Sequence, residues 1–272
     1  AGRVRAGGPG GLAPGTPVVV AGHDHQVGAW AAGVREPGQV ANSLGTAESV
    51  IRILDQRPEP GAIAAEGMSL VRTPDGHEAL VAGSPAAAAM LDWLADQLQG
   101  ADLATALTTA AGRARSPHAP LALPYLHGRQ APRPDPLARA VVVGEVADDG
   151  DLACAVVDGL ALHARWLTTA QGELAGAAGV SGAVTGSGAV GAMTAGASGT
   201  SLGTEAVEAS GAVVLGAGGL VDSAWLRAKA AAGPGRLRFV TASEPVAAGA
   251  ALLAGYRAGL TGPLTLPSSP AA

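Results

Sequence analysis

The sequence predicts a layered α/β fold, and three observations support this class. Over residues 212–259, segments with the pattern of strands alternate with segments with the pattern of helices, which is typical of α/β proteins. Two pairs of strand-like segments, at 38–54 and 68–83, each surround a short turn sequence. The chain is 48% hydrophobic but only 3% aromatic, so we expect a core built mainly from alanine, valine and leucine.

Apolar runs and turn residues predict the first elements of the chain. The stretch TPVVVAG predicts a short buried strand bounded by Pro17 and Gly22, and HQVGAWAAGV after it predicts a helix. The two hairpins follow, with GT and PDG as their turn residues. Residues 84–100 then predict a helix that Ser84 caps and Gly100 ends.

Loops and helices alternate further along the chain. Residues 122–136 hold four prolines and form either an ordered or a disordered loop, since composition does not decide between the two. A stripe of apolar residues predicts a helix over 151–167. Residues 172–211 are poor in large side chains, so we expect a flexible insertion there.

Two strand–helix units close the chain. Residues 212–230 predict a strand, a glycine turn and a helix, and residues 236–259 predict a strand and a helix. Ser243 is the expected N-cap of the last helix, with Pro245 in its first turn. We expect the tail over 260–272 to be frayed.

Charge and cysteine content exclude several classes of partner. The net charge is −5 with no basic cluster, which argues against nucleic acid or an anionic membrane as the main partner. No apolar run reaches the roughly 20 residues of a membrane span. No apolar stretch follows the N-terminal arginines, so we expect no signal peptide. The single cysteine, Cys154, suits a reducing compartment, and we expect a cytoplasmic protein.

Asp24 is the first candidate for chemistry. It follows the predicted strand, where a carboxylate can project into a cleft at the strand's carboxyl end and accept a proton from a substrate hydroxyl. The alternative is that Asp24 caps the following helix. His23 and His25 flank it, but the chain offers neither a cysteine partner nor an H-x-x-x-H helix there, so we expect packed or solvated histidines and no metal.

Two glycine-containing segments are candidates for phosphate or nucleotide contacts. Gly45 and Thr46 could present N–H groups and a hydroxyl to a phosphate, although the same residues also make an ordinary hairpin turn. The segment LGAGGLVDSAW predicts a glycine turn from a strand into a helix, which suits either a nucleotide or tight strand–helix packing. Gly216 and Gly218 resemble a dinucleotide fingerprint, but Val221 stands where its third glycine belongs, so that fold is disfavoured.

Five segments in order resemble the FGGY family of carbohydrate kinases. The family's domain junction, with a G-x-x-D-[Q/H] segment and a later SlGTS stretch, is similar to PVVVAGHDHQVGAWAAGVREPGQVANSLGTAESV. The family's proline loop, the helix after it, its adenine-side glycine segment and its closing helix are similar to LALPYLHGRQAPRPDPLARAVVVG, DLACAVVDGLALHARW, VVLGAGGLVDSAW and SEPVAAGAALLAGYRAG. The resemblance spans residues 10–260.

The resemblance implies an α/β fold of the actin/hexokinase-like (ribonuclease H-like) ATPase type, with ATP and Mg²⁺ held in a cleft between two domains. The family's chemistry consists mainly of positioning groups and stabilising charge around the transferred phosphoryl group. Eight positions take roles by this resemblance: Asp24 as the general base, His23 and His25 beside the sugar, Gly45 and Thr46 in the second phosphate loop, and Gly218, Gly219 and Ser223 at the adenosine pocket.

The resemblance also implies a domain organisation, the C-terminal half of a two-domain kinase. Residues 1–37 would end the N-terminal sugar-binding domain. Residues 38–262 would form the nucleotide-binding domain with its insertion at about 172–211, and residues 263–272 a tail. The chain has no D-x-G-T segment, which the family uses for phosphate and Mg²⁺, so we expect most of the N-terminal domain to be missing from it.

The expected function is ATP-dependent phosphorylation of a sugar or polyol hydroxyl, and family members frequently pair, which makes a homodimer one of the open oligomeric states. A non-catalytic nucleotide-binding or assembly remnant is the alternative, and a sugar-binding protein without nucleotide is less favoured. The family's Glu-Arg pair in the proline loop is replaced by Arg129 and Gln130, its GTS serine by Ala47, and a helix glutamate by Asp158. The sequence does not identify the sugar.

Overall fold

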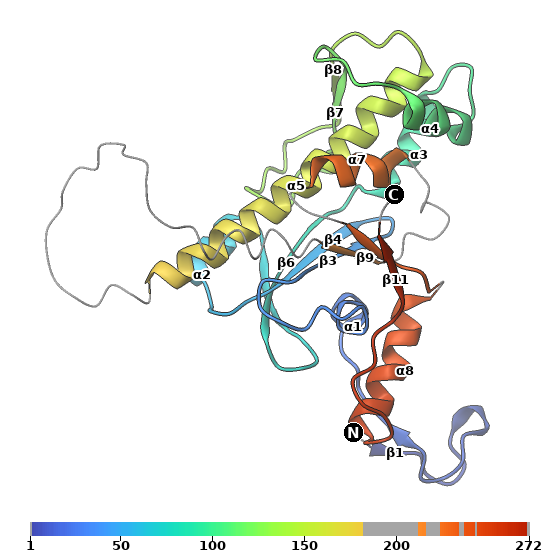
Figure 1. The fold of residues 1–272 in the computed structure, drawn as a ribbon, viewed down its shortest axis with the longest axis vertical. Coiled ribbons are helices and arrows are strands. Elements are labelled where there is room, and N and C mark those ends of the chain that lie inside the picture. The colour runs from blue at the N-terminus through green and yellow to red at the C-terminus, as the bar shows by residue number, and fades with distance from the viewer. Residues whose placement is uncertain (1, 182–211, 216–223, 234–236, 243, 271–272) are drawn as a thin grey trace, which may run out of the picture.

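The computed structural model describes residues 2–181, 212–215, 224–233, 237–242 and 244–270 of the chain. Within them, a mixed seven-stranded sheet runs through the centre of the molecule (Figure 1). Its strands, in spatial order, are β11 (Ser268–Pro270), β10 (Arg238–Val240), β9 (Ala212–Leu215), β3 (Val40–Leu44), β4 (Glu48–Ile53), β6 (Glu78–Ser84) and β5 (Ser69–Arg72).

Both predicted hairpins are confirmed as neighbouring pairs in this sheet. β3 and β4 pair antiparallel, with Leu44 opposite Glu48 on either side of the Gly45-Thr46 turn. β5 and β6 pair antiparallel around the predicted PDG turn. β9 lies parallel to both β3 and β10. β3 is therefore the strand at which the antiparallel hairpins join the parallel strands from the end of the chain.

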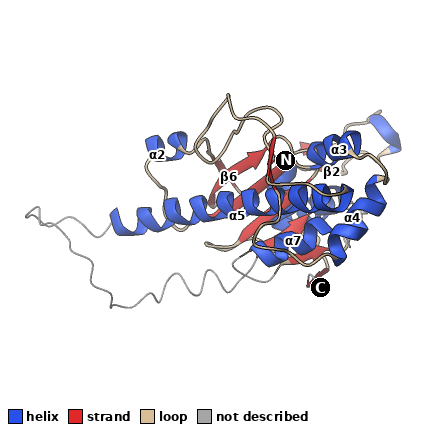
Figure 2. Cartoon of the chain, turned by 90° about the horizontal axis from the view of Figure 1, so that it is seen from above, coloured by secondary structure: helices blue, strands red, loops and turns tan. Residues whose placement is uncertain are grey.

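Helices cover both faces of the sheet (Figure 1), and Figure 2 looks onto one of these faces. One face carries α3 (Ala88–Gln97), α4 (Leu103–Gly112), α5 (Asp149–Ser181) and α7 (Ala224–Ala232), and the other carries α1 (Asp24–Ala31) and α8 (Pro245–Arg257). Residues of β4 alternate between the two faces. Val50 packs in a buried cluster with Leu167 of α5. Ile51 packs on the other face in a second buried cluster, the α1–α8 cluster, which includes Trp30 of α1 and Leu253 of α8. A sheet buried on both sides explains why all six β4 residues are buried.

The remaining described elements lie around this layered core. Two small sheets pair β1 (Gly2–Arg3) with β2 (Pro17–Val18), and β7 (Leu121–Leu123) with β8 (Val141–Val143). A short 3-10 helix, η1, spans Pro9–Gly11, and α2 (Pro60–Ala65) precedes β5. Among the described helices, none combines the length and the apolar character that crossing a bilayer requires.

Close backbone packing fixes two helices. A Cβ on Gly159 of α5 would lie 1.9 Å from the carbonyl oxygen of Ala122 in β7, and a Cβ on Gly249 of α8 would lie 2.8 Å from the Cβ of Ala31 in α1. Glycine at these positions therefore lets α5 rest directly on β7, and α8 directly on α1.

Two predictions about the first hundred residues are wrong. The predicted buried strand is only the exposed two-residue β2, and Val20 beyond it is 80% exposed, because β2 pairs with β1 and no described helix covers it. The helix predicted over 84–100 begins later, at Ala88, because Ser84 still pairs with Glu48 as the last residue of β6.

Three predictions about the second half also change. α5 continues to Ser181, so the first ten residues of the range expected to be flexible are helical, and 182–211 lie outside the described residues. Glu244 occupies the N-cap position of α8 in place of Ser243, which also lies outside them. The tail is not frayed over its whole length, because β11 extends the sheet beside β10. In the proline-rich segment 122–136, the first two residues belong to β7, and the rest is an ordered loop with a bridge between Arg129 and Asp135.

Candidate active site

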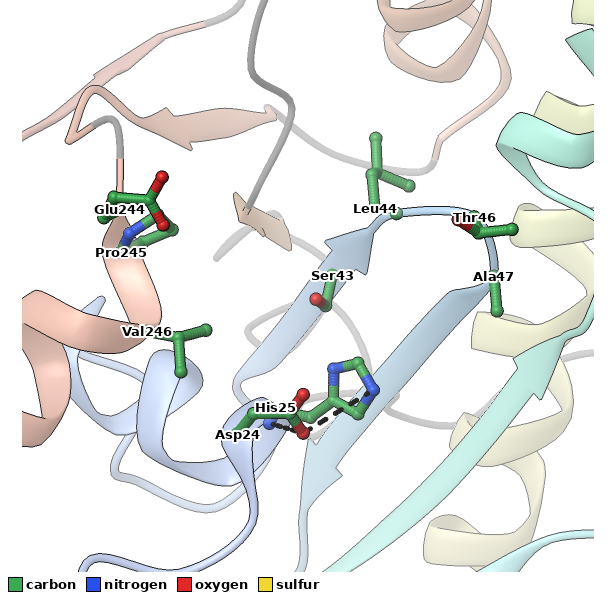
Figure 3. A pocket seen from close by; sticks show the side chains of 10 residues that line it. Asp24, His25, Ser43, Leu44, Thr46, Ala47, Glu244, Pro245 and Val246 are labelled. Carbon is green, nitrogen blue, oxygen red and sulfur yellow. Dashed lines mark hydrogen bonds and ion pairs between the residues drawn. The ribbon is translucent and has the colours of Figure 1, made fainter.

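The site is a cleft of about 450 Å³ where three chain segments meet (Figure 3). The start of α1, the end of β3 with its turn, and the start of α8 contribute its lining residues: Asp24, His25, Ser43, Leu44, Gly45, Thr46, Ala47, Glu244, Pro245 and Val246. Four of the eight residues expected from the sequence thus face one space. The close packing of α1 on α8 holds two of these three segments together.

Asp24 is the first residue of α1, and the chain enters the helix through Gly22 at a positive φ of 132° that other residues rarely adopt. His23, not Asp24, occupies the N-cap position, so the capping alternative for Asp24 is wrong. Asp24 Oδ1 accepts a hydrogen bond from the N–H of His25 at 2.8 Å. The side chain of Asp24 remains 57% exposed, so its carboxylate can be reached by a substrate hydroxyl.

The two histidines surround this carboxylate. His23 Nδ1 lies 2.5 Å from Asp24 Oδ1, and His25 Nε2 lies 3.9 Å from the same oxygen. Burial lowers the pKa of His25, while Asp24 acts to raise that pKa and His23 to lower it. The lowered pKa favours the neutral imidazole, which can both donate and accept a hydrogen bond.

One potential ligand atom from each of these three side chains lies within 4.8 Å of the other two. No further histidine, cysteine or carboxylate of the described part joins this group. The expectation that His23, Asp24 and His25 hold no resident metal stays a prediction.

The turn between β3 and β4 uses its backbone groups unequally. Gly45 N–H donates to the carbonyl of Ala47 at 2.9 Å, so this amide is not available to a phosphate. The carbonyls of Gly45 and Thr46 accept from Ala88 and Ala87 at the start of α3. The N–H groups of Thr46 and Ala47 have no backbone acceptor among the described residues. Two amides and the Thr46 hydroxyl are therefore the groups with which this turn can hold an anion.

His23 lies beside Asp24 but is not among the residues that line the cleft. Gly218, Gly219 and Ser223 lie outside the described residues. Sequence reasoning did not assign Ser43 or Glu244 to the site, although both are polar residues at the end of a strand or the start of a helix. That position is the signal by which they could have been found.

The arrangement of sheet, helices and cleft defines a class of protein. A mixed central sheet with helices on both faces and a cleft at the β3–β4 turn is an actin/hexokinase-like, ribonuclease H-like fold. The model of the C-terminal domain of the FGGY family of carbohydrate kinases matches residues 40–258. The chain belongs to this family, and the resemblance noted in the sequence is confirmed.

Solved structures agree on the fold. The xylulose kinase from Rhodospirillum rubrum matches with a TM-score of 0.69 and 21% identity over 95% of this chain and 46% of that chain. The ligand-bound xylulose kinase from Lactobacillus acidophilus matches with a TM-score of 0.68 and 17% identity over 93% of this chain and 45% of that chain. The Plasmodium falciparum glycerol kinase with ADP matches with a TM-score of 0.67 and 14% identity over 91% of this chain and 44% of that chain. This chain therefore spans less than half the length of these kinases. No curated protein matches its sequence significantly.

Proposed function

We propose that this chain forms the nucleotide-binding half of an ATP-dependent kinase that phosphorylates a hydroxyl of a sugar or polyol. One observation carries the proposal: Asp24 and the Thr46 turn, expected to serve the two reactants, line the same cleft. The membership of the FGGY family supports the reaction class. The names of the similar structures, xylulose, gluconate and glycerol kinases, support a sugar or polyol as the acceptor.

Each residue then has a defined task. Asp24 accepts the proton of the attacking hydroxyl, because its carboxylate is exposed to the cleft. His25 and His23 orient the acceptor beside it. The amides of Thr46 and Ala47, with the Thr46 hydroxyl, hold phosphate oxygens of the nucleotide. Gly218, Gly219 and Ser223 line the adenosine pocket.

The groups present suit ATP and Mg²⁺, which supply the phosphoryl group and neutralise its charge. Mg²⁺ prefers oxygen ligands and would enter with the phosphates of ATP, which the Thr46 and Ala47 amides and the Thr46 hydroxyl can hold. The chain's own part is to offer the Asp24 carboxylate and the turn amides in one cleft, from which water is displaced when the acceptor binds.

Asp24→Asn tests the base in the kinase assembled from this chain and its N-terminal half. Because a general base acts in the transition state, kcat should fall by at least about 100-fold while ADP affinity stays within about twofold. Asp96→Asn, on an exposed acid of α3, is the matched control and should change neither quantity. Equal losses of ADP affinity and turnover in Asp24→Asn would contradict the role of Asp24.

A coupled assay of ADP release over a panel of pentuloses, hexuloses, polyols and glycerol identifies the acceptor. A protein that binds ADP but turns over none of these compounds would instead support the non-catalytic alternative.

A further inference from the structure

A buried ion pair lies directly behind the turn that lines the cleft. Lys229 Nζ of α7 contacts Glu48 Oε1, and Glu48 is the first residue of β4 after that turn. Asn42 Nδ2 of β3 donates to the same oxygen at 2.6 Å. The side chains of Lys229 and Glu48 are only 4% and 0% exposed. The pair thus ties two segments that are 181 positions apart in the chain.

Stability alone does not account for this pair. Removing two charges from water carries a desolvation penalty, and apolar residues of similar volume are often at least as stable in such positions. The hydrogen bonding is also incomplete, because the described part of the chain offers no partner to the buried Glu48 Oε2 and Asn42 Oδ1. Buried charges do, however, restrict two elements to one relative position, since any shift leaves an unpaired charge in the interior.

The position that the pair restricts is that of the turn relative to α7. Glu48 is two residues from Thr46, and the backbone of this turn also holds the start of α3. Lys229 stands one helical turn after Trp225, with its ammonium group 5.7 Å from the centre of that fully buried ring.

We propose that Glu48 and Lys229 are positioning residues that keep the phosphate-binding turn in register with α7, and so hold the Thr46 and Ala47 amides in the cleft. The inference rests on the proposed function. Neither residue is among those that line the cleft. Both act through the turn, whose Thr46 and Ala47 amides must reach the phosphates.

The double variant Glu48→Gln/Lys229→Met removes both charges, keeps unbranched side chains of similar length, and leaves an amide oxygen that can still accept from Asn42 Nδ2. We expect its thermal unfolding midpoint to stay within a few degrees of the unmodified chain, because no unpaired charge remains, whereas each single variant should unfold at a lower temperature. In the assembled kinase, the double variant should bind ADP at least tenfold more weakly and show a higher KM for ATP with a smaller change in kcat. A double variant that keeps the original ADP affinity would overturn the proposal.

A matched control removes an ion pair of the same sheet that lies away from the cleft. Arg57→Met/Glu78→Met deletes the exposed contact at the start of β6, and its ADP affinity should equal that of the unmodified protein. An equal loss of ADP affinity in this control would show a general effect of lost charge and would also overturn the proposal.

Hydrogen exchange separates this inference from the proposed function. The amides of Gly45, Ala87 and Ala88 report directly on the turn, because they form its hydrogen bonds. In the double variant without nucleotide, their protection should fall at least tenfold while that of β4 and β6 stays unchanged. If the unmodified protein binds no ADP, the proposed function is wrong, and the exchange result still decides whether the pair positions the turn. Unchanged protection of these amides would overturn the positioning role.

Discussion

His163 of α5 carries an ionisable group inside the core. It is 5% exposed, and its Nδ1 lies 3.4 Å from the hydroxyl of Tyr125. Burial lowers its pKa to about 4, while Glu48 acts to raise that pKa and Lys229 and Arg129 to lower it. The folded chain therefore keeps this imidazole neutral at pH values where the unfolded chain would already protonate it.

This difference predicts a loss of stability in mild acid. With an ordinary pKa of 6.5 in the unfolded chain and about 4 in the folded one, the unfolded state binds more protons between these values, so stability is intact above pH 6.5 and falls as the pH drops toward 4. Between pH 7.5 and 5 the loss from this group is about 2 kcal/mol. Urea unfolding at both pH values measures it.

His163→Gln is the matching variant, since glutamine is polar and does not titrate. It should lower stability at neutral pH but lose about 2 kcal/mol less than the unmodified chain between pH 7.5 and 5. Equal pH dependence in the two proteins would show that His163 does not hold the lowered pKa.

The long helix α5 depends on one close contact with its neighbouring strand. Gly159 faces the backbone of β7, with no room for a Cβ beside the carbonyl oxygen of Ala122. Gly176, on the same helix, has nothing within 4 Å of the place where a Cβ would lie. The two glycines therefore occupy one helix in opposite packing environments.

Substituting both glycines with alanine separates packing from helix propensity. Gly159→Ala should destabilise the chain by at least about 2 kcal/mol, because the backbone of α5 or β7 must move. Gly176→Ala should be neutral or stabilise it by up to about 1 kcal/mol, since alanine favours the helix. Urea unfolding gives both values, and a neutral Gly159→Ala would show that α5 does not rest directly on β7.

The end of the chain joins the whole molecule together. β11 extends the central sheet beside β10, and Leu266 is buried in the α1–α8 cluster. Leu266 N–H donates to the carbonyl of Ala31 at 2.7 Å, and Arg35 donates to the carbonyls of Pro263 and Leu264 at 2.9 and 2.5 Å. These contacts secure α1, the helix that carries Asp24.

Ending the chain after Gly262 should therefore destabilise the fold. Loss of the Leu266 side chain alone should lower the free energy of unfolding by about 2 kcal/mol, and loss of β11 should lower it further. Leu260→Ala, at an exposed leucine just before the cut, is the control and should have little effect. Equal stability of the shortened and the full chain in urea would contradict this role of the tail.

The local pattern of apolar and turn residues in the sequence was sufficient to predict much of the fold. The β3–β4 and β5–β6 hairpins, α1 and the helix through His163 follow from apolar spacing and from turn residues that are close together in the chain. The family also followed from the order of short motifs, and the match over residues 40–258 confirms it. Such features need no knowledge of distant contacts, because each one reports the conformation of a few neighbouring residues.

Contacts between distant segments required the folded chain. Three contacts depend on how the elements pack. Asp24 lines one cleft with Thr46 and Glu244, Glu48 pairs with Lys229, and the tail forms a strand beside β10. The predicted strand after Pro17 is exposed for the same reason, because its pattern shows that it is apolar but not whether anything covers it. Residue spacing specifies which side of an element is apolar, and only packing decides what that side meets.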